Sequence, residues 1–258
     1  MKKTTAEIVT TDGSCRTELH MPDGAGPFPA VLLCMDAGGV RAALSDMAAR
    51  IAAWGYVVAI PDFFHRVGSP FDLMPGSAHT MATVREIFRD PEKRGVFFGK
   101  YFASAIAPDH VRTDISAVLD HLATLPEVKK SRAAITGYCM GGNLALRAAS
   151  LVPHRLALVT SFHGGGLVTD APDSPHLGAA KIEARVYVAG AIEDDLFPEA
   201  AKQALVAALE AAHVRNTVET YPAHHGFCVG DNPSYNHEAA ERHYKKLEEL
   251  LGSELGSA

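Results

Sequence analysis

The sequence has no run of about 18 apolar residues, and the two lysines after Met1 are not followed by an apolar stretch. The first absence argues against a transmembrane helix, and the second argues against a secretory signal. No cluster of Lys and Arg stands out, and the net charge is −6, so we expect neither nucleic acid nor a membrane as partner. The cytoplasm is therefore the expected compartment.

Cysteine is scarce, and its spacing excludes the common metal motifs. The four cysteines (Cys15, Cys34, Cys139 and Cys228) form no C-x-x-C pair, and the 13 histidines include no H-E-x-x-H. In a protein that is not secreted, such cysteines are expected to be reduced thiols. We predict no metal site.

Length and composition fit one α/β domain. The chain has 258 residues, of which 47% are hydrophobic and 21% charged, and it shows neither an internal repeat nor a linker. We therefore predict a single domain over residues 1–258. Residues 62–109 are rich in Pro, Gly and aromatic residues and are expected to form an irregular, lid-like excursion or an excursion of short helices. Residues 252–258 are expected to be a frayed tail.

Strand-like apolar runs alternate with segments of helical periodicity. An Asp-Gly pair between the first two strand candidates predicts a hairpin. The alternation indicates a single-domain α/β fold with a mainly parallel, doubly wound sheet and helices on both faces. Strands are predicted at 7–10, 15–20, 30–35, 56–60, 133–136, 156–161, 184–189 and 217–221, and helices at 43–54, 111–125, 141–150, 198–212 and 235–251.

The most informative segment is Gly-Tyr-Cys-Met-Gly-Gly at 137–142, between a predicted strand and a predicted helix. It has the form of the G-x-S-x-G nucleophile elbow, with Cys139 in place of serine. Glycines flank such an elbow because strand and helix approach closely there. The helix N-terminus favours a thiolate, and the Met140 N–H is an expected oxyanion donor. The alternative is that Cys139 is a small buried residue on a structural turn.

An α/β-hydrolase places its acid after a later strand and its histidine near the end of the chain. Asp194 follows the strand at 184–189 and is the predicted acid, with Asp195 in reserve, although these acids could also cap the next helix. His225 follows the strand at 217–221 and is the predicted base, with His224 as the alternative. The other eleven histidines are expected to pack in the core or lie on the surface.

Together these residues resemble the dienelactone hydrolase family, also called carboxymethylenebutenolidases, of α/β-hydrolases. The resemblance rests on residues 137–142, 194–198 and 225–227, and it extends through Gly-Tyr-Val-Val-Ala-Ile-Pro-Asp at 55–62 to nearly the whole chain. It implies a Cys-His-Asp triad, no cofactor, and hydrolysis of a small lactone or ester through a thiol-ester intermediate.

The resemblance also assigns residues around the triad. Asp36 stands where the family carries a glutamate that contacts the resting thiol, and the Ala37 N–H would be the second oxyanion donor. Arg66 falls where the family places an arginine for a substrate carboxylate, a task that suits the forked guanidinium. A second family arginine is replaced by Val229, which implies weaker or different carboxylate binding. Asp36 and Arg66 could also be ordinary loop and surface residues.

Two other functions fit the same sequence. A general carboxylesterase or thioesterase would use the same triad on a different small ester, with or without a carboxylate. A non-catalytic ligand-binding relative would keep the fold, but such relatives usually lose a triad residue, whereas Cys139, Asp194 and His225 are all present.

Overall fold

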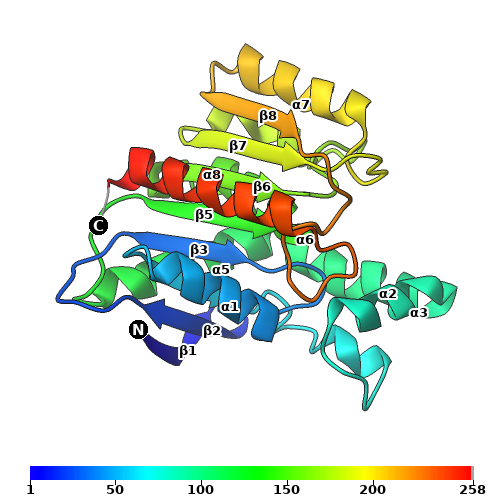
Figure 1. The fold of residues 1–258 in the computed structure, drawn as a ribbon, viewed down its shortest axis with the longest axis horizontal. Coiled ribbons are helices and arrows are strands. Elements are labelled where there is room, and N and C mark those ends of the chain that lie inside the picture. Colours follow the sequence, from blue (N-terminus) through cyan, green and yellow to red (C-terminus); the bar gives the residue numbers. More distant parts are fainter. Residues whose placement is uncertain (257–258) are drawn as a thin grey trace.

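Eight strands form one sheet in the computed structural model, which describes residues 1–256 (Figure 1). The strand order is β1-β2-β4-β3-β5-β6-β7-β8. Strands β1 and β2 form the predicted antiparallel hairpin, β2 also pairs antiparallel with β4, and the remaining strands pair in parallel. The strands are β1 (Lys2–Thr10), β2 (Gly13–Met21), β3 (Ala30–Cys34), β4 (Val57–Pro61), β5 (Ala133–Tyr138), β6 (Leu156–Phe162), β7 (Arg185–Gly190) and β8 (Asn216–Thr220).

Helices cover both faces of this sheet. In Figure 1, α1 (Ala42–Ala52) and α8 (His237–Leu255) lie in front of the strands, and α5 (Pro108–Thr124) and α6 (Met140–Leu151) lie behind them. Helix α7 (Glu199–Ala211) packs beside β8. This arrangement confirms the predicted mainly parallel α/β-hydrolase fold.

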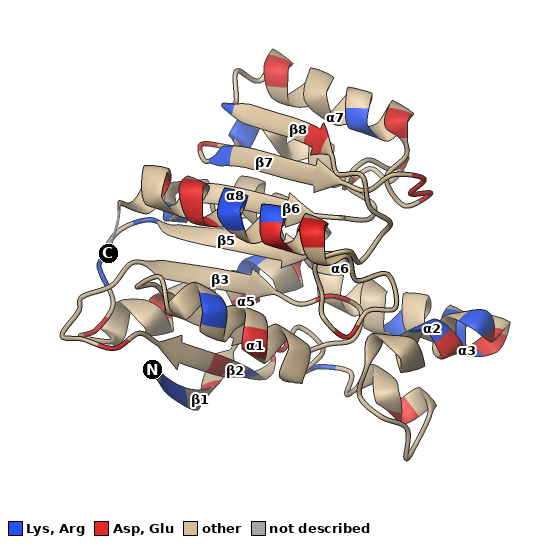
Figure 2. Cartoon of the chain, viewed as in Figure 1, with Lys and Arg blue, Asp and Glu red and all other residues tan. Residues whose placement is uncertain are grey.

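The centre of the sheet is buried and contains no charged residue. Strands β3, β5 and β6 contain no charged residue, and every residue in them is buried. Figure 2 shows the central strands free of charged residues, with residues of both signs interspersed along α8. Such continuous apolar runs are typical of parallel strands covered on both faces, and they explain why these strands could be predicted within about two residues of their ends.

Residues 62–109 form mainly short helices, one of the two alternatives predicted for this excursion. The side chain of Thr80 accepts a hydrogen bond from the Thr83 N–H and begins α2, and the Asp90 side chain accepts from two N–H groups and begins α3. The segment contains η1 (Pro70–Leu73), α2 (Met81–Arg89), α3 (Pro91–Val96), the π-helix η2 (Phe97–Phe102) and α4 (Ala103–Ile106); two further short helices are η3 (Pro153–Arg155) and η4 (Pro175–Lys181).

Most of the predicted frayed tail is helical. Helix α8 continues to Leu255, whose side chain is buried. Glu254 in its last turn forms ion pairs with Arg185 and Arg215, and these contacts hold the turn against the sheet. Residues 257–258 lie outside the described part of the chain.

The carboxyl ends of the parallel strands meet at one edge of the sheet. Cys139 follows β5, His163 follows β6, Asp194 comes after β7 and His225 after β8. Ligands of open α/β sheets bind outside this edge, so the topology gathers the candidate functional residues in one place. Within residues 1–256, no helix combines the length and the apolar character that crossing a bilayer requires.

Candidate active site

Cys139 sits at the tip of a tight turn between β5 and α6. Its φ is 54° and its ψ is −115°, a conformation that residues other than glycine rarely adopt. A Cβ on Gly137 would lie 1.9 Å from the Gly141 carbonyl oxygen, and one on Gly141 would lie 2.2 Å from the Cys34 carbonyl oxygen. Both flanking positions therefore require glycine, and the turn leaves the Cys139 side chain partly exposed.

His225 and Asp194 are joined by a hydrogen bond. The distance between His225 Nδ1 and Asp194 Oδ2 is 2.8 Å, and the other carboxylate oxygen accepts from the Leu196 N–H at 3.0 Å. Asp194 is buried, whereas the reserve candidate Asp195 is exposed. The alternative base, His224, is also exposed. The geometry thus selects the acid and the histidine that the chain order favoured.

The pKa of His225 is raised by its neighbours. Burial alone would lower this pKa, but the electrostatic interaction with Cys139 and the hydrogen bond with Asp194 outweigh burial and raise the pKa to about 10. The Nε2 atom of His225 is buried and has no hydrogen-bond partner within residues 1–256. Because Asp194 occupies Nδ1, Nε2 is the nitrogen that remains for proton transfer.

Two backbone N–H groups near Cys139 have no acceptor. Met140 is the first residue of α6, so its N–H has no acceptor within the helix. Ala37 lies just past β3 and is buried. In the described part of the chain neither N–H donates a backbone hydrogen bond. They are the two donors that the sequence suggested for an oxyanion.

Asp36 does not make the predicted contact with the Cys139 thiol. Its two carboxylate oxygens accept from Arg41 at 2.6 and 2.9 Å, and one of them also accepts from the Gly38 N–H at 2.9 Å. Arg41 is itself buried and donates two further hydrogen bonds of 2.7 Å to Asp231. The carboxylate of Asp36 is therefore bonded to the buried guanidinium of Arg41, which also binds Asp231, and not to the Cys139 thiol.

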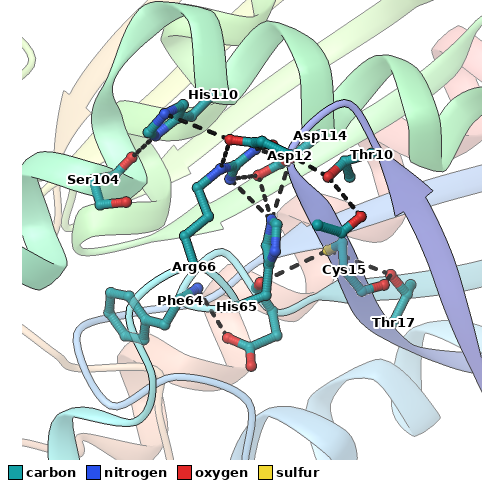
Figure 3. A network of polar contacts seen from close by, with 12 residues as sticks. Thr10, Asp12, Cys15, Thr17, Phe64, His65, Arg66, Ser104, His110 and Asp114 are labelled. Carbon is teal, nitrogen blue, oxygen red and sulfur yellow. Dashed lines mark hydrogen bonds and ion pairs between the residues drawn. The ribbon is translucent and has the colours of Figure 1, made fainter.

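Arg66 is engaged in a structural network rather than open to a substrate carboxylate (Figure 3). It donates to Asp12 at 2.6 and 2.8 Å and to Asp114 at 2.7 and 2.8 Å, which engages four of its five N–H groups, and His65 Nε2 lies 2.9 Å from its Nη1. Asp12 is in the β1–β2 turn and Asp114 is in α5. The geometry argues against the predicted substrate contact and assigns Arg66 to holding these elements together.

A family model described as "Dienelactone hydrolase family" matches residues 15–255 of the chain. The chain belongs to the dienelactone hydrolase family. A "Putative carboxymethylenebutenolidase" of Synechocystis sp. is 28% identical over 92% of this chain and 91% of that protein. A protein of the same name from Methylorubrum extorquens is 26% identical over 94% of this chain and 78% of its own length.

Solved structures agree with this assignment at the level of the fold. The crystal structure of a "Putative Dienelactone Hydrolase" from Klebsiella pneumoniae has a TM-score of 0.83 and 21% identity, covering 97% of this chain and 98% of its own. Membership of the dienelactone hydrolase family makes this chain a hydrolase of the type that acts on esters or lactones.

Two residues near the candidate active site of this dienelactone hydrolase family member were not identified from the sequence. Arg41 gave no signal, because its partner Asp231 is 190 residues away and its other partner, Asp36, lies five residues away in a loop that shows no periodic pattern. His163 was expected only to pack, yet it stands directly after β6, at the sheet edge that carries the other candidates. Its place in that order could have identified it. No three His, Cys, Asp or Glu side chains among residues 1–256 are grouped to hold a metal ion, so we assign no metal ligands.

Proposed function

We propose that this protein opens a small lactone or ester with Cys139 as nucleophile, His225 as acid–base residue and Asp194 as the carboxylate that orients the imidazole. The observation that carries the proposal is the elbow at Cys139 together with the 2.8 Å hydrogen bond between His225 Nδ1 and Asp194, and the raised pKa of His225, of which Cys139 is a cause, agrees with it. A nucleophile, a base and a carboxylate that orients the base are the recurring elements of such hydrolases.

The raised pKa of His225, about 10, keeps the imidazole protonated at neutral pH. The proposed attacking form of Cys139 is the thiolate, which a neighbouring imidazolium favours. The sulfur attacks the carbonyl carbon, and the carbonyl electrons move to oxygen. The N–H groups of Ala37 and Met140 then donate to this oxyanion, and each such donor is typically worth about 3 kcal/mol.

Collapse of the oxyanion breaks the bond between carbonyl carbon and ester oxygen. The leaving oxygen takes the proton from His225 Nε2, and the acyl group remains on Cys139 as a thiol ester. The neutral imidazole then removes a proton from water, the resulting hydroxide attacks the thiol ester, and the thiolate leaves. The carboxylic acid loses its proton to solvent. An enol lactone suits this chemistry because its leaving oxygen is resonance-stabilised.

The charges around the site favour an acyl substrate without a carboxylate. Arg41 and Arg66 are both committed to carboxylates of the protein itself, and Val229 stands where the family pattern has an arginine. This observation favours a neutral lactone or ester as substrate. A general carboxylesterase therefore fits the site about as well as a dienelactone hydrolase does. A non-catalytic relative would have no use for the strained backbone at Cys139.

Selective alkylation tests the proposal against a non-catalytic role. We expect one equivalent of iodoacetamide at neutral pH to modify Cys139 and to leave the other three cysteines intact. Those three are buried, and burial raises the pKa of Cys15 to about 12 and also raises the pKa values of Cys34 and Cys228. Peptide mapping by mass spectrometry locates the label.

The matched variant for this experiment is His225→Gln, which removes the imidazolium partner. Its alkylation at neutral pH should be at least about tenfold slower, because the thiolate loses its counter-charge. Equal labelling of several cysteines, or an unreactive Cys139 in the folded protein, would contradict the proposed nucleophile.

A further inference from the structure

One short segment, residues 162–165, contacts the backbone of Cys139 and the end of the strand that leads to Asp194. The Cys139 N–H donates to the Phe162 carbonyl at 3.2 Å, and the Gly165 N–H donates to the Cys139 carbonyl at 3.2 Å. The His163 N–H donates to the Ala189 carbonyl at 2.8 Å, near the end of β7, the strand that leads to Asp194. The backbone on both sides of the nucleophile is therefore fixed to this segment.

The side chain of His163 extends the same segment to the histidine loop. Its ring centroid is 5.0 Å from the ring centroid of His225, with the planes at 64°. It lies edge-on to Phe227 at 5.0 Å, and its Nε2 is 3.3 Å from the Cys228 sulfur. One imidazole thus contacts three of the four residues in the loop 225–228.

Keeping histidine at this position is costly for the fold. The side chain is fully buried, and its Nδ1 has no hydrogen-bond partner among the described residues. Its φ is 41°, a left-handed value that a non-glycine residue adopts at a cost in strain. Unpartnered buried polar atoms are rare in proteins and call for an explanation. A role in packing alone would be met by an apolar ring.

The surroundings keep His163 uncharged. Burial, reinforced by the charge of His225, lowers the pKa of His163 well below its ordinary value of 6.5. Burial likewise raises the pKa of the Cys228 thiol well above 9.0. The His163–Cys228 contact is therefore a neutral thiol–imidazole contact. It can hold the loop without competing for the proton of His225.

We propose that His163 is a positioning residue that holds the imidazole of His225 in line between Asp194 and Cys139. Asp194 fixes one nitrogen of His225 but leaves the ring free to rotate about that bond. The edge contact with His163 supplies the second restraint, and the contacts with Phe227 and Cys228 anchor the loop that carries the ring. The inference rests on the proposed function, in which His225 transfers protons for Cys139.

Two substitutions at His163 separate the ring from the backbone. Asparagine tolerates a positive φ, so His163→Asn keeps the turn and removes the ring. His163→Phe keeps a ring and removes the nitrogens. We expect kcat for ester hydrolysis to fall about 10- to 100-fold in His163→Asn, because a displacement of about 1 Å can cost that much. KM should change less than threefold, and His163→Phe should recover only part of the lost kcat, because it keeps a ring beside His225 but loses the Nε2–Cys228 contact.

His243→Gln is the matched control. His243 is also fully buried with an unpartnered Nδ1, but its ring contacts Tyr138, Phe162 and Tyr244 instead of the histidine loop. Thermal unfolding is measured for each variant. A kcat for folded His163→Asn within twofold of the parent protein would overturn the proposal, and so would an equal loss of kcat in His243→Gln at equal stability.

A spectroscopic readout separates this inference from the proposed function. In the ¹⁵N-labelled full chain, the Nδ1 proton of His225 reports its hydrogen bond with Asp194 without any turnover. We expect His163→Asn to shift or broaden this signal and His243→Gln to leave it in place. An unchanged signal in His163→Asn would overturn the positioning role. Failure of the proposed function would appear elsewhere, as full activity in a Cys139→Ala variant.

Discussion

Cys139→Ala should lose ester hydrolysis by about 10⁴-fold or more in kcat while the protein remains folded. Removing the nucleophile of a triad leaves only the rate enhancement from oxyanion donors and binding. Alanine meets the same backbone strain as cysteine at φ 54°, so the fold should be indifferent to the change. Initial rates with an activated ester and urea unfolding measure the two effects separately.

Cys139→Gly sharpens the same experiment. Glycine adopts this backbone conformation without strain, so the variant should be inactive and yet more stable than the parent by about 1–2 kcal/mol. Cys15→Ala, at a buried cysteine in β2, is the control that should retain activity. Substantial turnover by folded Cys139→Ala would eliminate the proposed mechanism.

Arg66→Met should lower the free energy of unfolding by about 3 kcal/mol or more. The variant keeps an apolar stem but leaves Asp114, which is 1% exposed, with only the neighbouring His65 as a partner. Breaking a buried ion pair by removing one side typically costs about 3–5 kcal/mol. Urea unfolding at pH 7 measures this loss.

Arg112→Met is the matched control, because Arg112 pairs with Asp109 on the exposed surface of α5. An exposed pair contributes little, so the change should stay within about 0.5 kcal/mol. Both variants are then assayed with two esters that differ only by a carboxylate. An increase in KM of tenfold or more for the charged ester alone, in Arg66→Met alone, would restore the substrate role that the geometry argues against.

At acid pH, the difference in free energy of unfolding between Arg66→Met and the parent protein should become smaller. The hydrogen bond from Arg66 lowers the pKa of Asp12 to about 2, and hydrogen bonds from Arg66 and His65 outweigh burial to lower the pKa of Asp114. A carboxylate with a lowered pKa in the folded state stabilises above its unfolded pKa of about 3.9, and this contribution is lost as the pH falls through the folded value. The stability difference should therefore shrink between about pH 4 and pH 2.

The parts of the fold that depend on local pattern were predictable from the sequence. Continuous apolar runs marked the buried strands, and a 3.6-residue stripe marked α1, α5 and α8. The elbow was predictable because there is no space for a side chain at Gly137 or Gly141. The turn therefore requires glycine at both positions, and this pattern is visible in the sequence. The chain order of nucleophile, acid and histidine then selected Asp194 and His225, which the structure joins.

The ionic contacts could not be predicted, because they depend on partners distant in sequence. Arg66 and its carboxylates are 54 and 48 positions apart, and Arg41 and Asp231 are 190 apart. Family resemblance placed Arg66 and Asp36 in the site by position alone. It carried no information about the acids that occupy Arg66 or the arginine that occupies Asp36.

The individual helices of the excursion at 62–109 could not be placed from the sequence, for a local reason. Its helices are short, from four to nine residues, so none shows enough turns for a periodic stripe. Proline, glycine and aromatic residues suggested a loop, although Thr80 and the Asp90-Pro91 pair are recognisable helix starts. At the other end of the chain, Gly252 suggested a helix end, but burial of Leu255 and the ion pairs of Glu254 extend α8 past it.

The most direct measurement is the mass of the protein during turnover. The full chain is mixed with an activated ester, quenched in acid within milliseconds, digested and analysed by mass spectrometry. The account predicts an added acyl mass on the peptide that contains Cys139, lost again on treatment with hydroxylamine. Turnover in which that peptide stays unmodified, with the acyl mass on another residue, would contradict it.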